Sequence, residues 1–336
     1  MIDVALSLNE LRALCLEVLL GNGFEAQQAE PIADVIVRAE ADACRSHGLY
    51  RLPGYVASVS SGRANGRAVP KITQPTSAII RVDADKGFGP AASESARPAL
   101  IAAARRHGIA AMAMGNGHHF HALWADIEPL TQAGLACWAF VIGQLSVAPH
   151  GGTRKLMGTN PVSFGWPRRD APAFIFDFAT SMAARGEVEL KRLAGEALPA
   201  GWGIDPAGLP TTDPAMALAG AMLPFGGHKG SALSMMVELI AGPLIGEMTS
   251  HSVANKVAIA DSGPPPGGQL VIALDPAAFA PQAVGEAEAE TFFANARAQP
   301  GLRLASDRRH AAREEAHRHG VNISRDLMDR VRRLLP

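Results

Sequence analysis

The amino-acid sequence predicts an α/β or α+β fold that begins with a helical layer and ends in a helical segment. Apolar residues recur at helical spacing through most of residues 1–65. From about residue 77 onward, continuous apolar runs of strand length alternate with helical stretches. With 336 residues, 48% of them hydrophobic, the chain can bury a large core.

The N-terminal helices are predicted from a cap and from periodicity. Ser7 and Glu10 have the spacing of a capping box, and apolar residues then follow at helical spacing to position 18. A second helix is expected over 27–43 and a third, short one over 52–59. The polar residues Ser46, His47 and Arg51 lie at the junction between these two helices.

The middle of the chain is predicted as alternating strands and helices. Strands are expected at SAIIRVDA (from Ser77), IAAMAMGN, GLACWAFVIG, AFIFDFAT and GQLVIALD. Helices are expected at 91–107, 123–132 and 229–245, with a Pro/Gly-rich crossing at 199–214 and helix again from about Glu286. We therefore divide the chain into a helical segment 1–65, an α/β core 66–290 and a helical segment 291–336 that returns to the core.

Composition narrows the class of protein. The formal net charge is only -1, so no basic excess suggests a nucleic-acid partner. The three cysteines, Cys15, Cys44 and Cys137, are odd in number and widely spaced, which favours a reducing compartment over a disulfide framework. The N-terminus lacks the pattern of a signal peptide, and the longest apolar stretch is about half the ~20 residues of a membrane span. We expect a cytoplasmic protein with neither a membrane nor a nucleic-acid partner.

Two glycine-rich triplets do not make a dinucleotide fingerprint. The GNG sequences at Gly21 and Gly115 do not complete G-x-G-x-x-G, and the first follows a helix rather than a strand. A helix end and a tight turn explain them better, so a Rossmann assignment fails. Nor do His118, His119 and His121 have the spacing of a zinc site, although their place after a buried strand is where α/β proteins bind ligands. From the residues alone, a loop or core role explains these histidines somewhat better than a catalytic role.

Two further clusters carry polar chemistry. Arg51 lies one helical turn after His47, so the pair can face one point, with arginine holding a carboxylate and histidine exchanging a proton. A capped junction with an exposed arginine accounts for the same residues. The sequence 226–230, GGHKG, opens an apolar helix whose backbone N–H groups and Lys229 can attract an anion, although a plain loop is the alternative. Arg308, Arg309 and Arg313 are expected to form one solvated helix face.

Taken in order, several segments resemble one family. They are SHGLYRLPGY, HHFHALW, APHGGTRKLMGTNPVSF, DFATSMAARGE, LPAGWGIDPAGLPTTDP and LPFGGHKGSALSMMVELIAG. Nearly end to end, they resemble the malate/L-lactate dehydrogenase type-2 family. The resemblance implies a non-Rossmann NAD(P)-binding fold with a mainly antiparallel central sheet. It also implies a homodimer whose active sites lie between domains and near the partner subunit.

Within that family, HHF-x-ALW followed by DIEP looks most like the Δ1-piperideine-2-carboxylate/Δ1-pyrroline-2-carboxylate reductase branch. In hydroxyacid branches an asparagine stands where this chain has His118, and a Gly-Ala run stands at 121–124. His118 and Trp124 are therefore expected to give an aromatic wall that suits a flat cyclic imine.

The resemblance also implies roles for individual residues. Ser46, His47 and Glu187 would form the proton relay, and Arg51 and Thr159 would hold the substrate carboxylate. The cofactor would be lined by His119, Phe120, His121, Ala122, Leu123, Trp124, Asp177, Phe178, Ala179, His228, Lys229, Arg308 and Arg309. No metal is implied. Two departures stand out: Glu187 replaces the shorter aspartate usual in the branch, and the region Met248–Ser262 is short for the family.

The function implied is NADPH-dependent reduction of Δ1-pyrroline-2-carboxylate to L-proline and of Δ1-piperideine-2-carboxylate to L-pipecolate, with NADH as the alternative cofactor. One alternative is a 2-hydroxyacid dehydrogenase acting on malate, lactate, ureidoglycolate or a sugar acid. Another is a non-catalytic protein that binds a small molecule on the same scaffold, against which the retention of every candidate polar residue counts.

Overall fold

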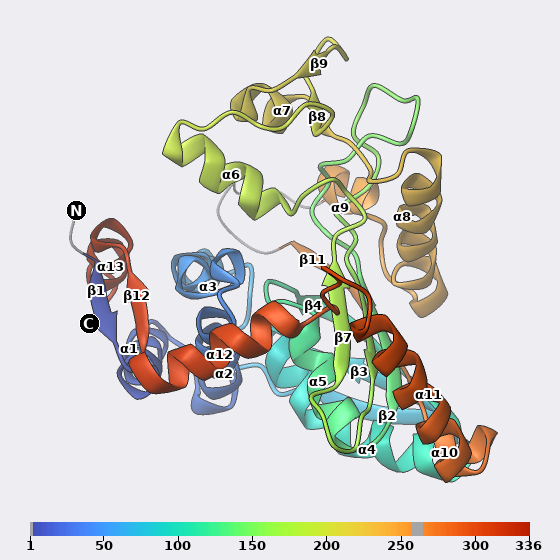
Figure 1. Cartoon of the computed structure of the whole chain (residues 1–336). Coiled ribbons are helices and arrows are strands. Elements are labelled where there is room, and N and C mark those ends of the chain that lie inside the picture. Colours follow the sequence, from blue (N-terminus) through green and yellow to red (C-terminus); the bar gives the residue numbers. More distant parts are fainter. Residues whose placement is uncertain (1–2, 257–264) are drawn as a thin grey trace.

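The N-terminal layer is helical, as the periodicity predicts. The structure is a computed structural model that describes residues 3–256 and 265–336. Its first elements are β1 (Val4–Leu6), α1 (Leu8–Gly21), α2 (Ala26–Ala41) and α3 (Leu52–Ser60). The predicted capping box is confirmed, because the Ser7 side chain accepts from the Glu10 N–H and the Glu10 carboxylate accepts from the Ser7 N–H. The apolar faces of α1, α2 and α3 meet in one core (Figure 1).

A seven-stranded sheet forms the centre of the molecule, in the order β2-β3-β4-β11-β5-β6-β7. The strands are β2 (Lys71–Thr76), β3 (Ile79–Asp83), β4 (Ile109–His118), β5 (Ala136–Val141), β6 (Val162–Trp166), β7 (Phe174–Phe178) and β11 (Pro266–Leu274). Only the β3–β4 pair is parallel, and every other neighbouring pair is antiparallel. The mainly antiparallel sheet implied by the resemblance is thus confirmed.

Helices cover the two faces of this sheet. On one face, α4 (Gly89–His107) and α5 (Trp124–Gln132) bury the largest apolar cluster. On the other, α8 (His228–Ile240) packs through Val237 against Phe140, Val162 and Leu270 of the strands. It is followed by η3 (Pro243–Ile245) and α9 (Ser250–Lys256).

A small second lobe stands above the sheet in Figure 1. It consists of α6 (Arg185–Ala194), β8 (Gly203–Ile204), β9 (Pro210–Thr211), α7 (Pro214–Ala219) and β10 (Ala221–Met222). Its own apolar cluster contains Val188, Leu198, Ala217 and Met222. Since α6 follows β7 directly, the lobe brings the start of α6 back over the helical N-terminal layer.

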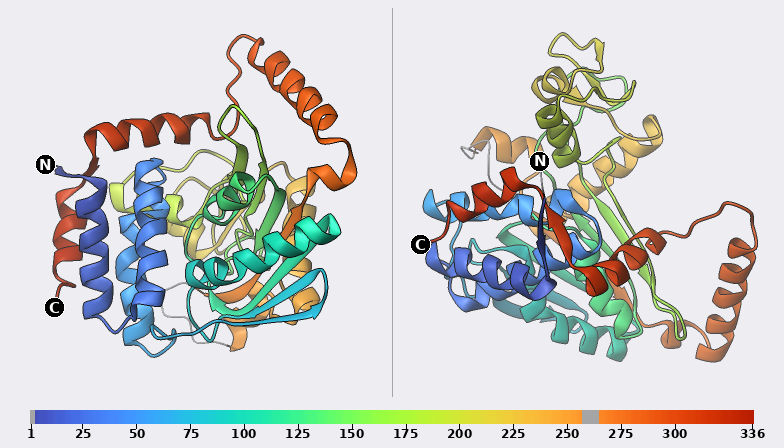
Figure 2. Two further views of the ribbon diagram at one scale, coloured as in Figure 1. Left: turned by 90° about the horizontal axis from the view of Figure 1, so that it is seen from below. Right: turned by 60° about the vertical axis from the view of Figure 1, so that its left-hand side comes forward.

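The C-terminal elements return to the N-terminal layer. They are α10 (Pro276–Phe279), α11 (Gln282–Arg297), α12 (Asp307–His319), β12 (Val321–Ile323) and α13 (Arg325–Arg332). The strand β12 pairs antiparallel with β1, so the two ends of the chain lie side by side. Figure 2 shows α11 as an arm that stands away from the body. The boundary that we drew at residue 290 falls inside α11.

Some predicted elements differ from the structure. The helix predicted over 229–245 ends at Ile240 and resumes only as the short η3, because Gly242 leaves the helical conformation (φ −112°, ψ −107°) just before Pro243. The edge strand β2 was not predicted because all six of its residues are exposed and show no apolar alternation. Of the region Met248–Ser262, Ser250–Lys256 forms α9 and residues 257–262 lie outside the described part of the chain.

Within residues 3–256 and 265–336, no single helix is both long and apolar enough to cross a membrane. One bent pair, His228–Ile245 with Ser250–Lys256, meets the length and composition requirements together, across a bend of 64°.

Candidate active site

Two short 3-10 turns hold the first cluster of polar side chains. These turns, η1 (Arg45–His47) and η2 (Leu49–Arg51), fill the junction between α2 and α3. The buried Glu40 carboxylate accepts a hydrogen bond from the Leu49 N–H at 2.7 Å. Gly48 lies so close to this carboxylate that a Cβ there would collide with it. The Glu40 carboxylate on α2 therefore fixes the conformation of the junction.

Within this junction the structure brings Ser46, His47 and Arg51 together. Ser46 Oγ lies 3.1 Å from His47 Nδ1, and Arg51 Nε donates to the Ser46 carbonyl oxygen at 2.6 Å. Burial, together with the positive charges of Arg51 and His121, lowers the pKa of His47 to about 3. Burial likewise lowers the pKa of Arg51 to about 10, still far above neutrality. The free protein thus holds a neutral histidine beside a charged arginine.

A cavity of about 730 Å³ opens beside Arg51. Arg51 and Phe120 both line it, with the guanidinium carbon 4.3 Å from the centre of the Phe120 ring. Tyr55 packs edge-on behind Phe120, with the ring centroids 5.3 Å apart. The opposite side is formed by α6 and α7 of the small lobe, including Arg185. A cationic group next to an aromatic ring can hold the carboxylate of a small ring-shaped ligand.

The prediction that His118 and Trp124 form an aromatic wall of the substrate site is wrong. Both side chains are buried in the protein, with 5% and 2% of their surface exposed, and neither lines this cavity. His118 Nε2 lies 3.2 Å from the Arg63 carbonyl oxygen, and its ring packs near Phe88. The aromatic residue of this segment that lies over Arg51 is instead the half-buried Phe120, which therefore forms the aromatic wall.

The next two histidines of the segment are buried behind Phe120. His119 Nε2 lies 3.1 Å from the Gly267 carbonyl oxygen, and burial lowers the pKa of His119 to about 3. His121 Nε2 lies 2.8 Å from the carboxylate of Asp126, an interaction that the sequence analysis missed. The only signal in the sequence was the five-residue spacing between His121 and Asp126. Because a loop precedes the helix here, that spacing does not show whether the two side chains face each other. The Nδ1 atoms of both histidines are buried and have no partner in the described part of the chain.

Trp124 joins this segment to the end of β7. Its backbone N–H donates to the Asp177 carboxylate at 2.9 Å. Burial raises the pKa of Asp177 to about 6. Ala122 and Leu123 are buried in the turn that precedes Trp124, and the guanidinium of Arg309 lies 4.7 Å from the centre of the indole ring. The 119–124 segment, the 177–179 turn and Arg309 are therefore parts of one assembly, as the resemblance implies.

The expectation that Arg308, Arg309 and Arg313 form one solvated face is wrong. Arg309 is 7% exposed, and Arg313 makes two hydrogen bonds to the fully buried Asp42, at 2.6 and 2.8 Å. Arg313 also binds Glu128 on α5 at 2.8 Å. The physical reason is the buried carboxylate of Asp42, which needs a positive partner and draws α12 onto α2. Of the three arginines, only Arg308 is exposed.

A buried amide network places the turns around Thr159 and Phe178. Asn160 Nδ2 donates to Glu238 Oε1 on α8 at 2.9 Å, and its Oδ1 accepts from the Gly143 N–H at 3.0 Å. Thr180 donates through both its N–H and its hydroxyl to the Thr159 carbonyl oxygen. Thr159 itself is half-buried, and no contact among the described residues joins it to Arg51. Its carboxylate-binding role stays a prediction.

The start of α8 lies beside the same turn. Phe225 packs edge-on against Phe178, with the ring centroids 5.6 Å apart, and its N–H donates to the Thr180 carbonyl oxygen. The helix begins at His228 after Gly227, whose φ of 61° suits glycine. His228 and Lys229 are both exposed in its first turn. A positive helix end with an exposed lysine can receive a phosphate.

Glu187, the third residue predicted for the proton relay, is not joined to the other two within the described residues. Glu187 lies in the first turn of α6 with an exposed side chain, and no interaction within the described ranges joins it to Ser46 or His47. The backbone next to it does approach the site, since a Cβ on Gly186 would lie 3.0 Å from Arg51 Nη2. The relay role of Glu187 therefore stays a prediction.

The residues present fit a nicotinamide dinucleotide. Buried polar atoms without hydrogen-bond partners in the described part of the chain gather along the 119–124 segment, namely His119 Nδ1, His121 Nδ1, Trp124 Nε1 and Arg309 Nη1, the last of which lies 3.6 Å from the Asp42 carboxylate. Such atoms cost free energy unless a ligand or water satisfies them. Exposed cations flank the assembly at Arg308 and Lys229, where they can meet phosphates. No group of three or more metal-ligating side chains occurs in the ranges that the structure describes.

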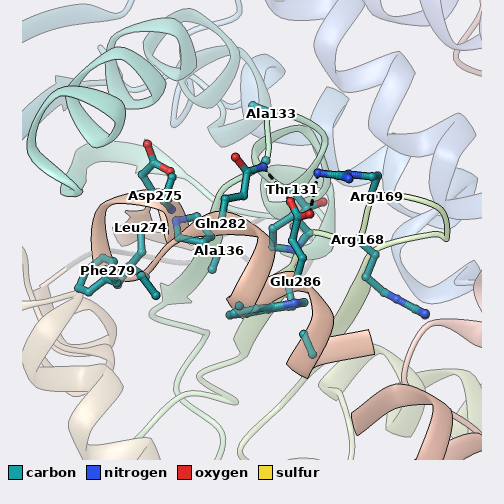
Figure 3. A pocket seen from close by; sticks show the side chains of 18 of the residues that line it. Thr131, Ala133, Ala136, Arg168, Arg169, Leu274, Asp275, Phe279, Gln282 and Glu286 are labelled. Atoms are coloured by element: carbon teal, nitrogen blue, oxygen red, sulfur yellow. Dashed lines mark hydrogen bonds and ion pairs between the residues drawn. The ribbon is translucent and has the colours of Figure 1, made fainter. Parts of the chain in front are cut away.

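A larger cavity, of about 1210 Å³, lies elsewhere. Figure 3 shows it under the α11 arm, where Gln282 and Glu286 face Arg169 and the end of α5. Arg169 and Glu286 form an ion pair at 2.7 Å across it. None of the predicted site residues lines this cavity.

With this geometry established, comparison with known proteins identifies the family. The model of the malate/L-lactate dehydrogenase family matches residues 6–332, and the chain belongs to that family. A relative from Ancylobacter novellus, a Δ1-pyrroline-2-carboxylate reductase, is 56% identical over 99% of this chain and 98% of its own length. A Δ1-pyrroline-2-carboxylate/Δ1-piperideine-2-carboxylate reductase from Pseudomonas aeruginosa is 46% identical over 96% of this chain and 97% of its own. The resemblance to this family and to its cyclic-imine reductase branch is confirmed.

Solved structures agree. The Δ1-piperideine-2-carboxylate reductase of Pseudomonas syringae pv. tomato superposes with a TM-score of 0.90 at 39% identity, over 98% of this chain and 99% of that one. Malate dehydrogenase from Entamoeba histolytica shares the fold, with a TM-score of 0.91 at 22% identity over 99% and 97% of the two chains. Family membership makes this chain an oxidoreductase that uses a nicotinamide cofactor.

Proposed function

We propose that the protein is an NADPH-dependent reductase of cyclic imino acids. Its substrates are Δ1-pyrroline-2-carboxylate, reduced to L-proline, and Δ1-piperideine-2-carboxylate, reduced to L-pipecolate. The observation that carries the proposal is the cluster of Ser46, His47 and Arg51 beside Phe120, in a chain that is 56% identical to a Δ1-pyrroline-2-carboxylate reductase.

Each side chain has a separate role in the proposed reaction. Arg51 binds the carboxylate of the ring, because its Nη groups remain available while Nε is held by Ser46. Phe120 packs against one face of the ring. A bound nicotinamide cofactor supplies the hydride that C2 accepts. The C=N double bond becomes a single bond, and the ring nitrogen requires a proton.

His47 is the proposed proton donor to that nitrogen. In the free protein the charge of Arg51 is one cause of its low pKa. A substrate carboxylate on Arg51 cancels much of that charge, so the pKa of His47 rises when substrate binds. Ser46, 3.1 Å from His47 Nδ1, fixes the orientation of the ring. His47 therefore gains its proton where and when the reaction needs it.

Cofactor preference follows from the exposed cations. Lys229 at the start of α8 and Arg308 at the start of α12 are both exposed, and neither has an ion-pair partner among the described residues. A 2′-phosphate near either group gains charge-assisted hydrogen bonds that NADH cannot make. We therefore favour NADPH.

We further propose that the protein works as a cytoplasmic homodimer. Three large apolar side chains of the α10–α11 arm, Phe279, Val284 and Phe292, are each 65% exposed. A second copy of the chain would cover such a surface. Sedimentation analysis should give twice the chain mass of 35.1 kDa. The free cysteines are consistent with a reducing compartment.

One absorbance screen tests the proposed function. NADPH and NADH consumption is followed with Δ1-pyrroline-2-carboxylate, Δ1-piperideine-2-carboxylate, pyruvate, oxaloacetate and a ureidoglycolate-type acid. We expect oxidation of NADPH with the two cyclic imines. Consumption with an open-chain acid alone would make the protein a 2-hydroxyacid dehydrogenase. No consumption with any substrate would leave a binding protein.

A further inference from the structure

The cavity beside Arg51 carries more positive charge than one substrate carboxylate requires. The charged residues that line it are one carboxylate, Glu189, and four arginines: Arg51, Arg185, Arg192 and Arg330. The Glu189 carboxylate accepts two hydrogen bonds from Arg192, at 2.7 and 2.9 Å, so this pair is neutral. When a substrate carboxylate binds Arg51, two cations remain, Arg185 and Arg330. No side-chain hydrogen bond or ion pair joins either of them to another residue in the described part of the chain.

The cofactor does not account for this charge. Of the residues proposed to line it, only Phe120 borders the cavity, whereas Lys229 and Arg308, the cations proposed for its phosphates, do not. The cavity is also large for one small ring with one carboxylate, because its volume of about 730 Å³ lies in the range of roughly 300–1,000 Å³ that larger ligands fill. A ligand of this site can therefore carry a second anionic group beyond the carboxylate on Arg51.

Arg185 is the better placed of the two remaining cations. It is the half-buried first residue of α6, the helix that forms the cavity wall opposite η2. The next residue, Gly186, approaches Arg51 so closely that a Cβ there would lie 3.0 Å from Arg51 Nη2. Arg330 instead lies with its guanidinium carbon 5.8 Å from the centre of the Tyr50 ring, a cation–π contact that partly satisfies its charge. An anion between the two walls can therefore reach Arg185.

We propose that the enzyme also reduces cyclic imines that carry a second carboxylate, with Arg51 holding the carboxylate on C2 and Arg185 holding the other. Δ1-Piperideine-2,6-dicarboxylate represents this class, because its carboxylates stand on the two ring carbons that flank the nitrogen, as the two arginines stand on opposite walls. Each carboxylate receives charge-assisted hydrogen bonds from a guanidinium group. C2 accepts the hydride of bound NADPH, the ring nitrogen accepts a proton from His47, and the C=N double bond becomes single. The products are piperidine-2,6-dicarboxylate and NADP⁺.

This inference rests on the proposed function, because it uses the same site and the same imine chemistry. The experiment measures kcat/KM at saturating NADPH for Δ1-piperideine-2-carboxylate and for Δ1-piperideine-2,6-dicarboxylate, with the wild type, Arg185→Gln and Arg185→Lys. Lys191→Gln is the matched control. It removes a cation of the same helix that pairs with Glu196 at 2.9 Å and does not line the cavity.

We expect the wild type to reduce the dicarboxylate with a kcat/KM at least equal to that for the monocarboxylate. Arg185→Gln should lower the ratio of the two values, dicarboxylate over monocarboxylate, by about tenfold or more, because only the dicarboxylate loses a charge-assisted hydrogen bond. Arg185→Lys keeps the charge but not the planar fork of donors, so it should restore part of the ratio. Lys191→Gln should keep the wild-type ratio.

A wild type that reduces the monocarboxylate but not the dicarboxylate would overturn the inference. So would an unchanged ratio in Arg185→Gln, because Arg185 would then share the C2 carboxylate with Arg51 or have only a structural role. If Arg185→Gln does not fold, product inhibition of the wild type decides the question. We expect piperidine-2,6-dicarboxylate to inhibit at a concentration about tenfold lower than L-pipecolate, and equal inhibition overturns the inference. A wild type that reduces neither imine defeats the proposed function instead.

Discussion

Arg51 donates a hydrogen bond from Nε to the carbonyl oxygen of Ser46 at 2.6 Å. The bond spans the two 3-10 turns between α2 and α3 and closes them into one unit. It fixes the guanidinium plane while leaving the two Nη groups for a ligand, and it places them next to Phe120. A site assembled in this way depends on the planar geometry of arginine.

Arg51→Lys should therefore raise the KM for Δ1-pyrroline-2-carboxylate by about tenfold or more, with kcat changed less than about threefold. Lysine keeps the charge but cannot hold Ser46 with one nitrogen and a carboxylate with two others. Steady-state kinetics measure both constants. Arg318→Lys, an exposed arginine at the far end of α12, is the control. An unchanged KM would remove Arg51 from the carboxylate site.

His47→Ala should lower kcat by about a hundredfold or more while leaving the KM for the imine within about threefold. Its proposed proton transfer contributes only in the transition state, and a positioned acid typically supplies ~10²–10⁴-fold. Single-turnover measurement of NADPH oxidation isolates the chemical step. A loss of affinity without a loss of turnover would assign His47 to binding rather than to proton transfer.

The buried histidines also make stability depend on pH. His47 and His119 have pKa values of about 3 in the folded protein, below their ordinary value of 6.5. Between these values the unfolded chain binds more protons, so stability falls as the pH is lowered. Burial raises the pKa of Asp177 to about 6. This carboxyl acts in the opposite direction, because on lowering the pH the folded protein binds the proton of Asp177 before the unfolded chain does.

Two histidines against Asp177 give a net loss of roughly 1.4 kcal/mol per pH unit between about pH 6 and pH 4. Burial also raises the pKa of the Glu40 carboxyl, which makes this loss smaller. Urea unfolding at several pH values measures this slope. His119→Gln removes one histidine and should make the slope nearly flat, whereas His319→Gln, at an exposed site, should not change it. If the free energy of unfolding of the wild type does not change over this range, the histidines bind protons as readily in the folded state as in the unfolded state.

The local chemistry of this chain was readable from its sequence, while its long-range pairings were not. Capping and periodicity predicted α1, α2 and the Ser46–Arg51 junction, because these depend on residues a few positions apart. The insertion of β11 between β4 and β5 depends on pairing across more than a hundred residues, for which periodicity carries no signal. Arg313 was assigned to solvent for the same reason, since its partner Asp42 lies 271 residues away.

NADPH should be used with higher kcat/KM than NADH. The double variant Lys229→Ala/Arg308→Ala should reduce that preference by about tenfold or more, because each charge-assisted hydrogen bond to a phosphate contributes roughly 1.5–3 kcal/mol. Arg325→Ala, at an exposed position on α13, is the control. Similar efficiency with both cofactors in the wild type would contradict the proposal.

Phe120 should decide the substrate class. Its half-buried ring lies 4.3 Å from the Arg51 guanidinium and forms part of the cavity wall, so that a carboxylate bound to Arg51 brings its ring or chain against an aromatic face. A pyrroline ring is flat and apolar on its faces and loses little by this contact. A hydrated open-chain acid loses hydrogen bonds to water, and each unpaired polar group costs about 1–3 kcal/mol.

Cyclic imines should therefore exceed pyruvate and oxaloacetate in kcat/KM by roughly tenfold or more, which requires only ~1.4 kcal/mol at the transition state. Phe120→Ala should bring this ratio towards one, chiefly by lowering kcat/KM for the imine. Leu20→Ala, which truncates an exposed apolar residue on α1, should leave the ratio unchanged. Competition assays with both substrates present measure the ratio directly. If oxaloacetate or pyruvate is reduced as efficiently as Δ1-pyrroline-2-carboxylate by the wild type, the imine assignment fails and a 2-hydroxyacid dehydrogenase takes its place.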